Sequence, residues 1–205
     1  MARPRTFDEA EVLEGAVAIF RERGYDGTSI PQLTKRLGIC RQSLYAAFGD
    51  KRGLYLRALE RWGEREVSCK LELLAQEEGS PLENLRTLVR GFAAYATACP
   101  NQGCFTVTAL VETRDDPEAL AVVERQIVRL EQGYQGALER AQAAGELLPS
   151  ARPARLARAL TTACNGIGLL TRLPSSGPRV ADSVSVLLEL INSHATQPSG
   201  GERWP

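Results

Sequence analysis

Glycine residues divide the first fifty residues of the chain into three short segments, each with apolar side chains at helical spacing. From Asp8 to Arg23 the apolar residues recur every three or four positions, and Gly24 follows directly. This spacing predicts an amphipathic helix. Asp8 is expected to cap its start and Gly24 to end it, because these residue types favour those positions.

The second and third segments are shorter and lie close together in the sequence. Thr28 and Ser29 offer hydroxyl caps for a helix that has proline in its first turn and ends at Gly38. A third helix is expected at residues 40–48. Two short helices joined by a tight turn, behind a longer amphipathic helix, form the tri-helical helix-turn-helix arrangement, whose last helix enters the DNA major groove.

The outer face of the third segment is small and polar. Short side chains let a helix approach base edges closely, while Arg41 and Gln42 can reach guanine or adenine. The stretch 28–57 also carries six basic residues and one acidic residue, although the whole chain has no net charge. Such charge is typical of a phosphate-binding surface, and a solvated helix face is the alternative. The predicted outward positions are Arg41, Gln42, Ser43, Ala46 and Ala47.

Four runs of residues carry a family resemblance: 16–20 (AVAIF), 24–30 (GYDGTSI), 37–39 (LGI) and 43–54 (SLYAAFGDKRGL). With their turn glycines, caps and aromatic positions in this order, they resemble the DNA-binding domain of the TetR family. A lone helix-turn-helix pattern would be weak evidence, whereas this match is long and ordered.

The resemblance implies a set of DNA contacts. Thr28 and Tyr45 would contact phosphates, as would Lys51 at the start of a fourth helix, where backbone N–H groups face the anion. The alternatives are a packed core aromatic for Tyr45 and a solvated lysine for Lys51. The residues predicted to bind DNA are Thr28, Ser29, Arg41, Gln42, Ser43, Tyr45 and Lys51, of which Arg41, Gln42 and Ser43 would read the bases.

Cys40 departs from the family pattern, in which Ser or Thr usually caps the recognition helix. Replacing a hydroxyl cap costs on the order of 1 kcal/mol, since a thiol is a poorer acceptor. A helix N-terminus also favours the thiolate form. Cys40 is therefore either a neutral substitution or a site sensitive to oxidants and electrophiles.

The remainder of the chain continues with helical spacing and without an alternating strand pattern. Breaks predict further helices at 51–76, 81–98, 104–113, 117–144, 154–173 and 180–193. We therefore expect an all-α fold of about nine helices, an N-terminal tri-helical helix-turn-helix followed by a C-terminal helical bundle. The predicted domains are a DNA-binding domain at 1–50, an effector-binding and dimerisation domain at 51–196, and a flexible tail at 197–205.

The last two predicted helices are the richest in aliphatic residues, which would be a liability if exposed on a monomer. The resemblance implies that these helices pair with a second copy in a four-helix interface, so that two-fold symmetry matches a palindromic operator. A buried core with no partner is the alternative. The predicted interface residues are Leu156, Leu160, Ile167, Leu170, Val184, Leu187, Leu188 and Ile191.

An effector pocket is expected between the fifth and eighth helices, although each candidate taken singly also fits a core role. The candidates are Phe92, Tyr95, Cys99, Cys104, Phe105, Thr108, Tyr134, Leu138 and Asn165.

The run 103–108 (GCFTVT), with Glu112 nearby, resembles the start of the sixth helix in TetR regulators that include electrophile and reactive-chlorine sensors. In those sensors the cysteine after the glycine reacts. A cysteine at a helix start is a candidate for attack on quinones, aldehydes or oxidants. Cys104 is therefore either a sensor or a small packed residue.

The sequence gives little support for an enzyme or for a metal site. His194 is the sole histidine, and no Gly-x-Ser-x-Gly, phosphate-binding glycine loop or His-Glu-x-x-His motif is present. Cys99 and Cys104 could form half of a zinc site, but no second pair or histidine completes four ligands. We expect no enzyme activity, cofactor or metal. A helical interaction module without DNA binding is a third reading, which the small outer face near Gln42 disfavours.

Five scattered cysteines make no disulfide framework, and no stretch of 18 apolar residues occurs. We therefore expect a cytoplasmic protein without membrane association. The resemblance implies a homodimeric transcriptional repressor on palindromic operator DNA. An unidentified small-molecule or electrophile effector would release it by moving the fourth helix, and activation is the alternative to repression.

Overall fold

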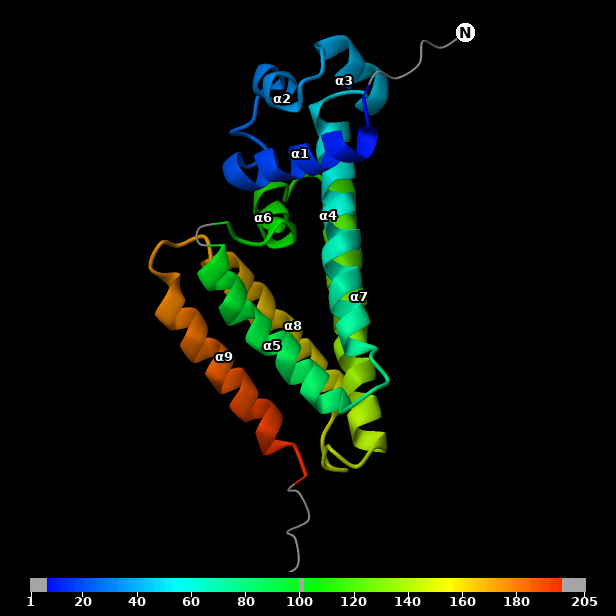
Figure 1. Ribbon diagram of the computed structural model, residues 1–205, viewed down its shortest axis with the longest axis vertical. Coiled ribbons are helices and arrows are strands. Elements are labelled where there is room, and N and C mark those ends of the chain that lie inside the picture. Colours follow the sequence, from blue (N-terminus) through cyan, green and yellow to red (C-terminus); the bar gives the residue numbers. More distant parts are fainter. Residues whose placement is uncertain (1–6, 100–101, 197–205) are drawn as a thin grey trace, which may run out of the picture. The chain divides into compact units, whose positions relative to one another are not determined.

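The computed structural model describes residues 7–99 and 102–196, and these ranges contain nine α-helices and no strand (Figure 1). An isolated antiparallel bridge pairs Leu147 with Ala195. The predicted all-α class is confirmed, and the largest shift of a helix end is at α9, which begins at Ser176 instead of residue 180. The predicted tail at 197–205 lies outside the described ranges. The helices are α1 (Glu9–Arg23), α2 (Ile30–Leu37), α3 (Arg41–Phe48), α4 (Lys51–Leu74), α5 (Pro81–Ala98), α6 (Phe105–Glu112), α7 (Pro117–Ala143), α8 (Pro153–Leu170) and α9 (Ser176–Ser193).

The chain divides into two compact units. The first contains α1, α2, α3 and α6, with α4 as far as Cys69 and α7 as far as Val128. The second contains the rest of α4 and α7 with α5, α8 and α9. The predicted domain boundary at residue 50 separates a DNA-binding function from an effector-binding and dimerisation function, and this division stays a prediction. The first compact unit contains α6 together with the helix-turn-helix.

Local capping explains where the first helices begin and end. The carboxylate of Asp8 accepts a 2.8 Å hydrogen bond from the backbone N–H of Ala10. Gly24 ends α1 with φ 73°, a conformation that glycine adopts without strain. At α2, Ser29 and Gln32 form a capping box, so Ser29 is confirmed as a cap. Thr28, the other predicted cap, does not cap α2, because its hydroxyl donates to the carbonyl of Gly24.

An aromatic cluster joins three helices in the core of the first unit. The ring of Tyr55 on α4 meets Phe20 of α1 and Phe105 of α6 edge to face, with centroids 5.0 and 5.5 Å apart. Tyr25, in the turn after α1, meets the same ring at 4.9 Å. Such pairs add about 0.5–1.5 kcal/mol each beyond their buried area. The start of α6 is therefore anchored in the core that supports the helix-turn-helix.

Aliphatic residues form the core of the second unit. Figure 1 shows α5, α8 and α9 side by side, and each of these helices contacts the other two. Leu85 and Val89 of α5, Leu160 of α8, and Val180 and Ile191 of α9 are almost fully buried there. Burial of such side chains contributes about 1.5–3 kcal/mol each.

Candidate functional site

One side of α3 is buried and the other faces solvent. Leu44 and Phe48 are buried in the first unit's core, while Arg41 and Gln42 are exposed. This is the orientation that a recognition helix needs. Two details differ from expectation, because Ser43 and Ala47 are half-buried and not fully outward.

Tyr45 joins the core of the first unit to the outer face of α3. Its half-buried ring packs against that core. Its hydroxyl accepts a 3.0 Å hydrogen bond from Nη2 of Arg41, whose guanidinium lies 5.2 Å from the ring centroid. The predicted base reader and the predicted phosphate contact are therefore neighbours in the protein without DNA. Their roles toward DNA stay predictions.

The sulfur of Cys40 caps α3. The backbone N–H of Ser43 donates to Sγ at 3.4 Å, and the hydroxyl Oγ of Ser43 lies 3.2 Å from the same atom. These hydrogen bonds, that of the hydroxyl first, lower the pKa of the exposed Cys40 thiol. The thiol therefore replaces the missing hydroxyl cap.

Lys51 and Thr28 hold the turn between α1 and α2. The ammonium Nζ of Lys51 donates to the carbonyls of Tyr25 and Thr28 at 3.0 and 3.1 Å and lies 4.0 Å from the centroid of the Tyr25 ring. The buried hydroxyl of Thr28 donates to the carbonyl of Gly24 at 2.7 Å. The predicted phosphate contacts of Lys51 and Thr28 stay predictions, which require these groups to exchange protein partners for DNA. Ser29, also predicted, is engaged in its capping box.

An ion pair that sequence reasoning missed ties the start of α4 to the start of α7. Arg52 donates two hydrogen bonds to Asp116, at 2.7 and 2.8 Å, and a third to Glu118 at 2.7 Å. The guanidinium lowers the pKa of Asp116 from 3.8 to about 2. Asp116 also caps α7 by accepting from the N–H groups of Glu118 and Ala119.

The nine candidates for an effector pocket divide between the two units, and their assignment stays a prediction. In the first unit Phe105 and Thr108 are buried, while Cys104 is half-buried as the N-cap of α6. The cap makes no side-chain hydrogen bond. In the second unit Tyr134 and Leu138 are buried, and the half-buried candidates are Phe92, Tyr95, Cys99 and Asn165.

The residues predicted to form a dimer interface are mostly core residues of the second unit. Six are buried within the single chain, and Leu170 and Leu188 are half-buried. Large apolar side chains exposed on α8, after it and on α9 are Leu169, Leu173 and Val186. The interface role of the eight stays a prediction, and the exposed three are additional candidates. The six buried residues are Leu156, Leu160, Ile167, Val184, Leu187 and Ile191.

In residues 7–99 and 102–196 no helix is long and apolar enough to span a bilayer, and no three His, Cys, Asp or Glu side chains are grouped to hold a metal ion. All five cysteines are free thiols.

Comparison with known families gives two matches. Residues 12–58 match the model described as "Bacterial regulatory proteins, tetR family". Residues 81–185 match the model described as "Tetracyclin repressor-like, C-terminal domain".

Relatives and solved structures agree with these matches. The chain is 33% identical to the HTH-type transcriptional regulator YezE of Bacillus subtilis over 195 residues, which cover 94% of this chain and all of YezE. It is 28% identical to the HTH-type transcriptional repressor ComR of Escherichia coli, covering 92% and 90% of the two chains.

Among solved structures, a cysteine mutant of the TetR family regulator CifR complexed with 26 bp double-strand operator DNA has a TM-score of 0.79 and 28% identity, covering 91% of this chain and 98% of that one. Escherichia coli NemR in its reduced form has the same fold, with a TM-score of 0.80 and 19% identity, covering 92% and 97%. These matches and the orientation of α3 lead to one conclusion: the chain belongs to the TetR family of bacterial transcriptional regulators.

Proposed function

We propose that this protein is a homodimeric, cytoplasmic repressor without enzyme activity, which reads a palindromic operator through α3 and leaves it when an effector binds. The observation that carries the proposal is the outer face of α3. Arg41 and Gln42 are exposed there on a helix whose other side is anchored by Leu44 and Phe48. ComR is named as a repressor, and the CifR complex contains operator DNA.

Base reading follows from the chemistry of the two exposed side chains. The fork of Arg41 matches the two acceptors of guanine, and the amide of Gln42 matches the donor and acceptor of adenine. Each such bidentate contact discriminates against a wrong base by about 1–3 kcal/mol. Tyr45 supports this reading because its hydroxyl, now bound by Arg41, is free to turn to a phosphate when Arg41 engages a base.

The remaining contacts would position the helix. Thr28, Ser29 and Lys51 lie around the start of α2 and α4, where backbone N–H groups favour anions. Ser43, which is also proposed to bind DNA, would contact the bases from the first turn of α3. Effector binding in the C-terminal domain would then change operator affinity by a coupling of about 1–3 kcal/mol, or five- to more than a hundredfold.

Fluorescence anisotropy with the duplex that precedes the protein's own gene tests this function. We expect saturable binding of two chains per duplex, with a much lower affinity for a scrambled duplex of equal length and with weaker binding as salt rises. Equal affinity for the scrambled duplex would contradict the proposal. A ligand that binds the protein and leaves operator affinity unchanged would contradict the release step for that ligand.

Electrophile sensing is a second candidate function. It is favoured by the lowered pKa of the exposed Cys40 thiol and by the half-buried Cys104 at the start of α6. A quinone should release the operator from the wild-type protein, and release should be lost in Cys40→Ser or Cys104→Ser. Cys69→Ser is the matched control, because Cys69 is exposed on α4. Unchanged release in both test variants would end this hypothesis.

A further inference from the structure

Three arginines on α4 form a row along the face that meets α1. Arg57, Arg61 and Arg65 are spaced four residues apart, so their side chains share one face of the helix. Arg57 pairs with Glu9, the first residue of α1, and the other two arginines pair with Glu14 at 3.0 and 2.6 Å. The row lies within the first compact unit, which also contains the helix-turn-helix. Three ion pairs therefore join α4 to α1.

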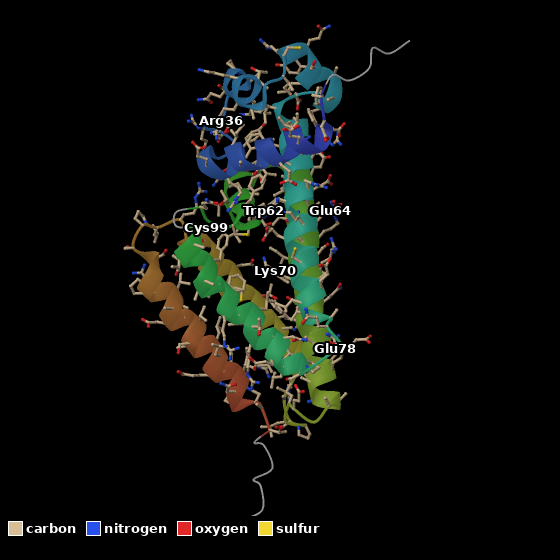
Figure 2. All side chains as sticks on the ribbon, in the orientation of Figure 1. Arg36, Trp62, Glu64, Lys70, Glu78 and Cys99 are labelled. Atoms are coloured by element: carbon tan, nitrogen blue, oxygen red, sulfur yellow. The ribbon has the colours of Figure 1, made fainter. Side chains whose placement is uncertain are left out.

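Each end of the row also contacts an aromatic ring. The guanidinium carbon of Arg65 lies 5.2 Å from the ring centroid of Trp62, which is labelled in Figure 2. At the other end, the guanidinium carbon of Arg57 lies 5.3 Å from the ring centroid of Phe48. Phe48 is the last residue of α3. Arg57 is therefore the member of the row that joins α1 and α4 to the recognition helix.

The charge of Arg57 is balanced within the protein. Arg57 ends the basic stretch 28–57, whose charge is typical of a phosphate-binding surface. In the structure its guanidinium is paired with the carboxylate of Glu9, whereas the guanidinium of Arg41 is bound to a neutral group, the hydroxyl of Tyr45. A paired cation attracts a phosphate less than an unpaired one, because the carboxylate cancels much of its field. The surroundings of Arg57 suit a side chain that holds α3 in place.

We propose that Arg57 is a positioning residue for base reading. Held by Glu9, its guanidinium fixes the ring of Phe48 and with it the C-terminal end of α3. A recognition helix that already has its bound orientation loses less conformational freedom when it binds DNA. Arg57 itself contacts neither a base nor a phosphate. The inference rests on the proposed function, because it concerns the reading of the operator by α3.

Fluorescence anisotropy of the full chain with the operator and scrambled duplexes, at several salt concentrations and well below Tm, tests this role. Arg57→Gln should weaken operator binding about two- to fivefold for each helix-turn-helix, and about four- to twenty-fivefold for the two that bind one duplex. Binding to the scrambled duplex should change much less. The slope of log affinity against log salt should keep its wild-type value, because no phosphate contact is lost.

A neighbouring arginine provides the matched control. Arg61 has the same kind of ion pair with α1 and a similar exposure, 45% against 43% for Arg57, but it lies one turn further from α3. Arg61→Gln should therefore bind both duplexes like wild type. Arg57→Lys keeps the cation and should restore most of the operator affinity. Glutamine, lysine and arginine have similar helix propensities, so these substitutions leave α4 itself little changed.

A double-mutant cycle tests whether Arg57 acts through the ring of Phe48. Phe48→Leu keeps an apolar side chain at the end of α3 and removes the ring. In that background Arg57→Gln should change operator affinity by less than about twofold, because the cation has lost its aromatic partner. An undiminished effect of Arg57→Gln would overturn the proposal. If Phe48→Leu does not fold, the comparison of Arg57→Gln with Arg61→Gln decides it alone.

Three further results would overturn the proposal. Arg57→Gln could bind the operator as tightly as wild type, or Arg61→Gln could lose as much affinity as Arg57→Gln. The salt slope of Arg57→Gln could become shallower by about 0.9 per chain, which would make Arg57 a phosphate contact. Equal affinity of the wild-type chain for both duplexes would contradict the proposed function and, with it, this inference. Wild-type discrimination that Arg57→Gln leaves unchanged would contradict this inference alone.

Discussion

The carboxylate of Glu112, the last residue of α6, accepts a 2.9 Å hydrogen bond from the backbone N–H of Tyr25, in the turn between α1 and α2. A Cβ atom at Gly24 would overlap the same carboxylate, so the side chain lies tightly against the turn. The C-terminal end of α6 is therefore tied directly to the helix-turn-helix, within one compact unit.

Loss of this hydrogen bond should destabilise the helix-turn-helix. Glu112→Ala leaves the N–H of Tyr25 without its carboxylate acceptor, and we expect a loss of about 1 kcal/mol in the free energy of unfolding, with weaker operator binding. Urea melts and operator anisotropy measure the two effects. Asp115→Ala is the control, because Asp115 lies nearby with its side chain 90% exposed. A Glu112→Ala protein that matches Asp115→Ala in both assays would show that the tie is unimportant.

The packing of a buried glutamine, Gln126 on α7, leaves no room for a side chain at Gly63 on α4. The amide of Gln126 on α7 donates to the carbonyl of Leu59 at 2.9 Å and accepts from the hydroxyl of Thr106 at 2.7 Å. A Cβ at Gly63 would overlap this amide, whereas one at Gly91 on α5 meets nothing within 4 Å.

Gly63→Ala should therefore destabilise the protein by about 1–3 kcal/mol, since the amide must leave its two partners. Gly91→Ala should stabilise it by about 0.5–1 kcal/mol, because alanine favours a helix interior more than glycine. Chemical denaturation of the two variants compares them directly. Equal effects of the two substitutions would be incompatible with the described packing of Gln126.

The Arg52–Asp116 pair predicts a pH dependence. The pKa of Asp116 falls from 3.8 to about 2 on folding, so the ionised carboxylate stabilises the fold above pH 4. That contribution is lost as the pH falls from about 4 toward 2. Asp116→Asn should cost about 1 kcal/mol near neutral pH, a value reduced by screening because Arg52 is 43% exposed. Urea melts between pH 3 and 7 should show this difference shrinking with acid. A constant difference would refute the ion pair's role.

The cap of α3 predicts the reactivity of its thiol. Because Ser43 lowers the pKa of Cys40, more of the thiol is thiolate near neutral pH, and its alkylation by iodoacetamide should be faster than in the Ser43→Ala variant. Mass spectrometry follows the modification at each cysteine as a function of pH. The rate at Cys69, exposed on another helix, provides the internal reference. An alkylation rate at Cys40 that Ser43→Ala leaves unchanged would argue against the capping geometry.

The helix ends and the exposed side of α3 could be predicted from the sequence because local interactions determine them. Asp8, Gly24 and Ser29 act on backbone groups within a few residues, and the structure has these caps as predicted. The exposure of Arg41 and Gln42 follows from the spacing of apolar residues on the same short helix.

Long-range contacts were not accessible, because no spacing in the sequence encodes them. Nothing near Glu112 or Gln126 indicates that these side chains reach Tyr25 and Leu59 across the fold. The aliphatic residues of α8 and α9 show the same limit. A stripe of apolar residues predicts that one face of a helix is buried, but it does not predict whether α5 or a second chain covers that face. Residues such as Leu160 are buried within the single chain.

Reading of bases by α3 is the central claim, and the affinity ratio between operator and scrambled duplex tests it most directly. Arg41→Ala and Gln42→Ala should each reduce the difference in binding free energy between operator and scrambled duplex by about 1–3 kcal/mol. The affinity for scrambled DNA should change much less. The matched controls are Arg129→Ala and Gln132→Ala, exposed positions of α7 in the second unit. A wild-type ratio in both α3 variants would contradict the account.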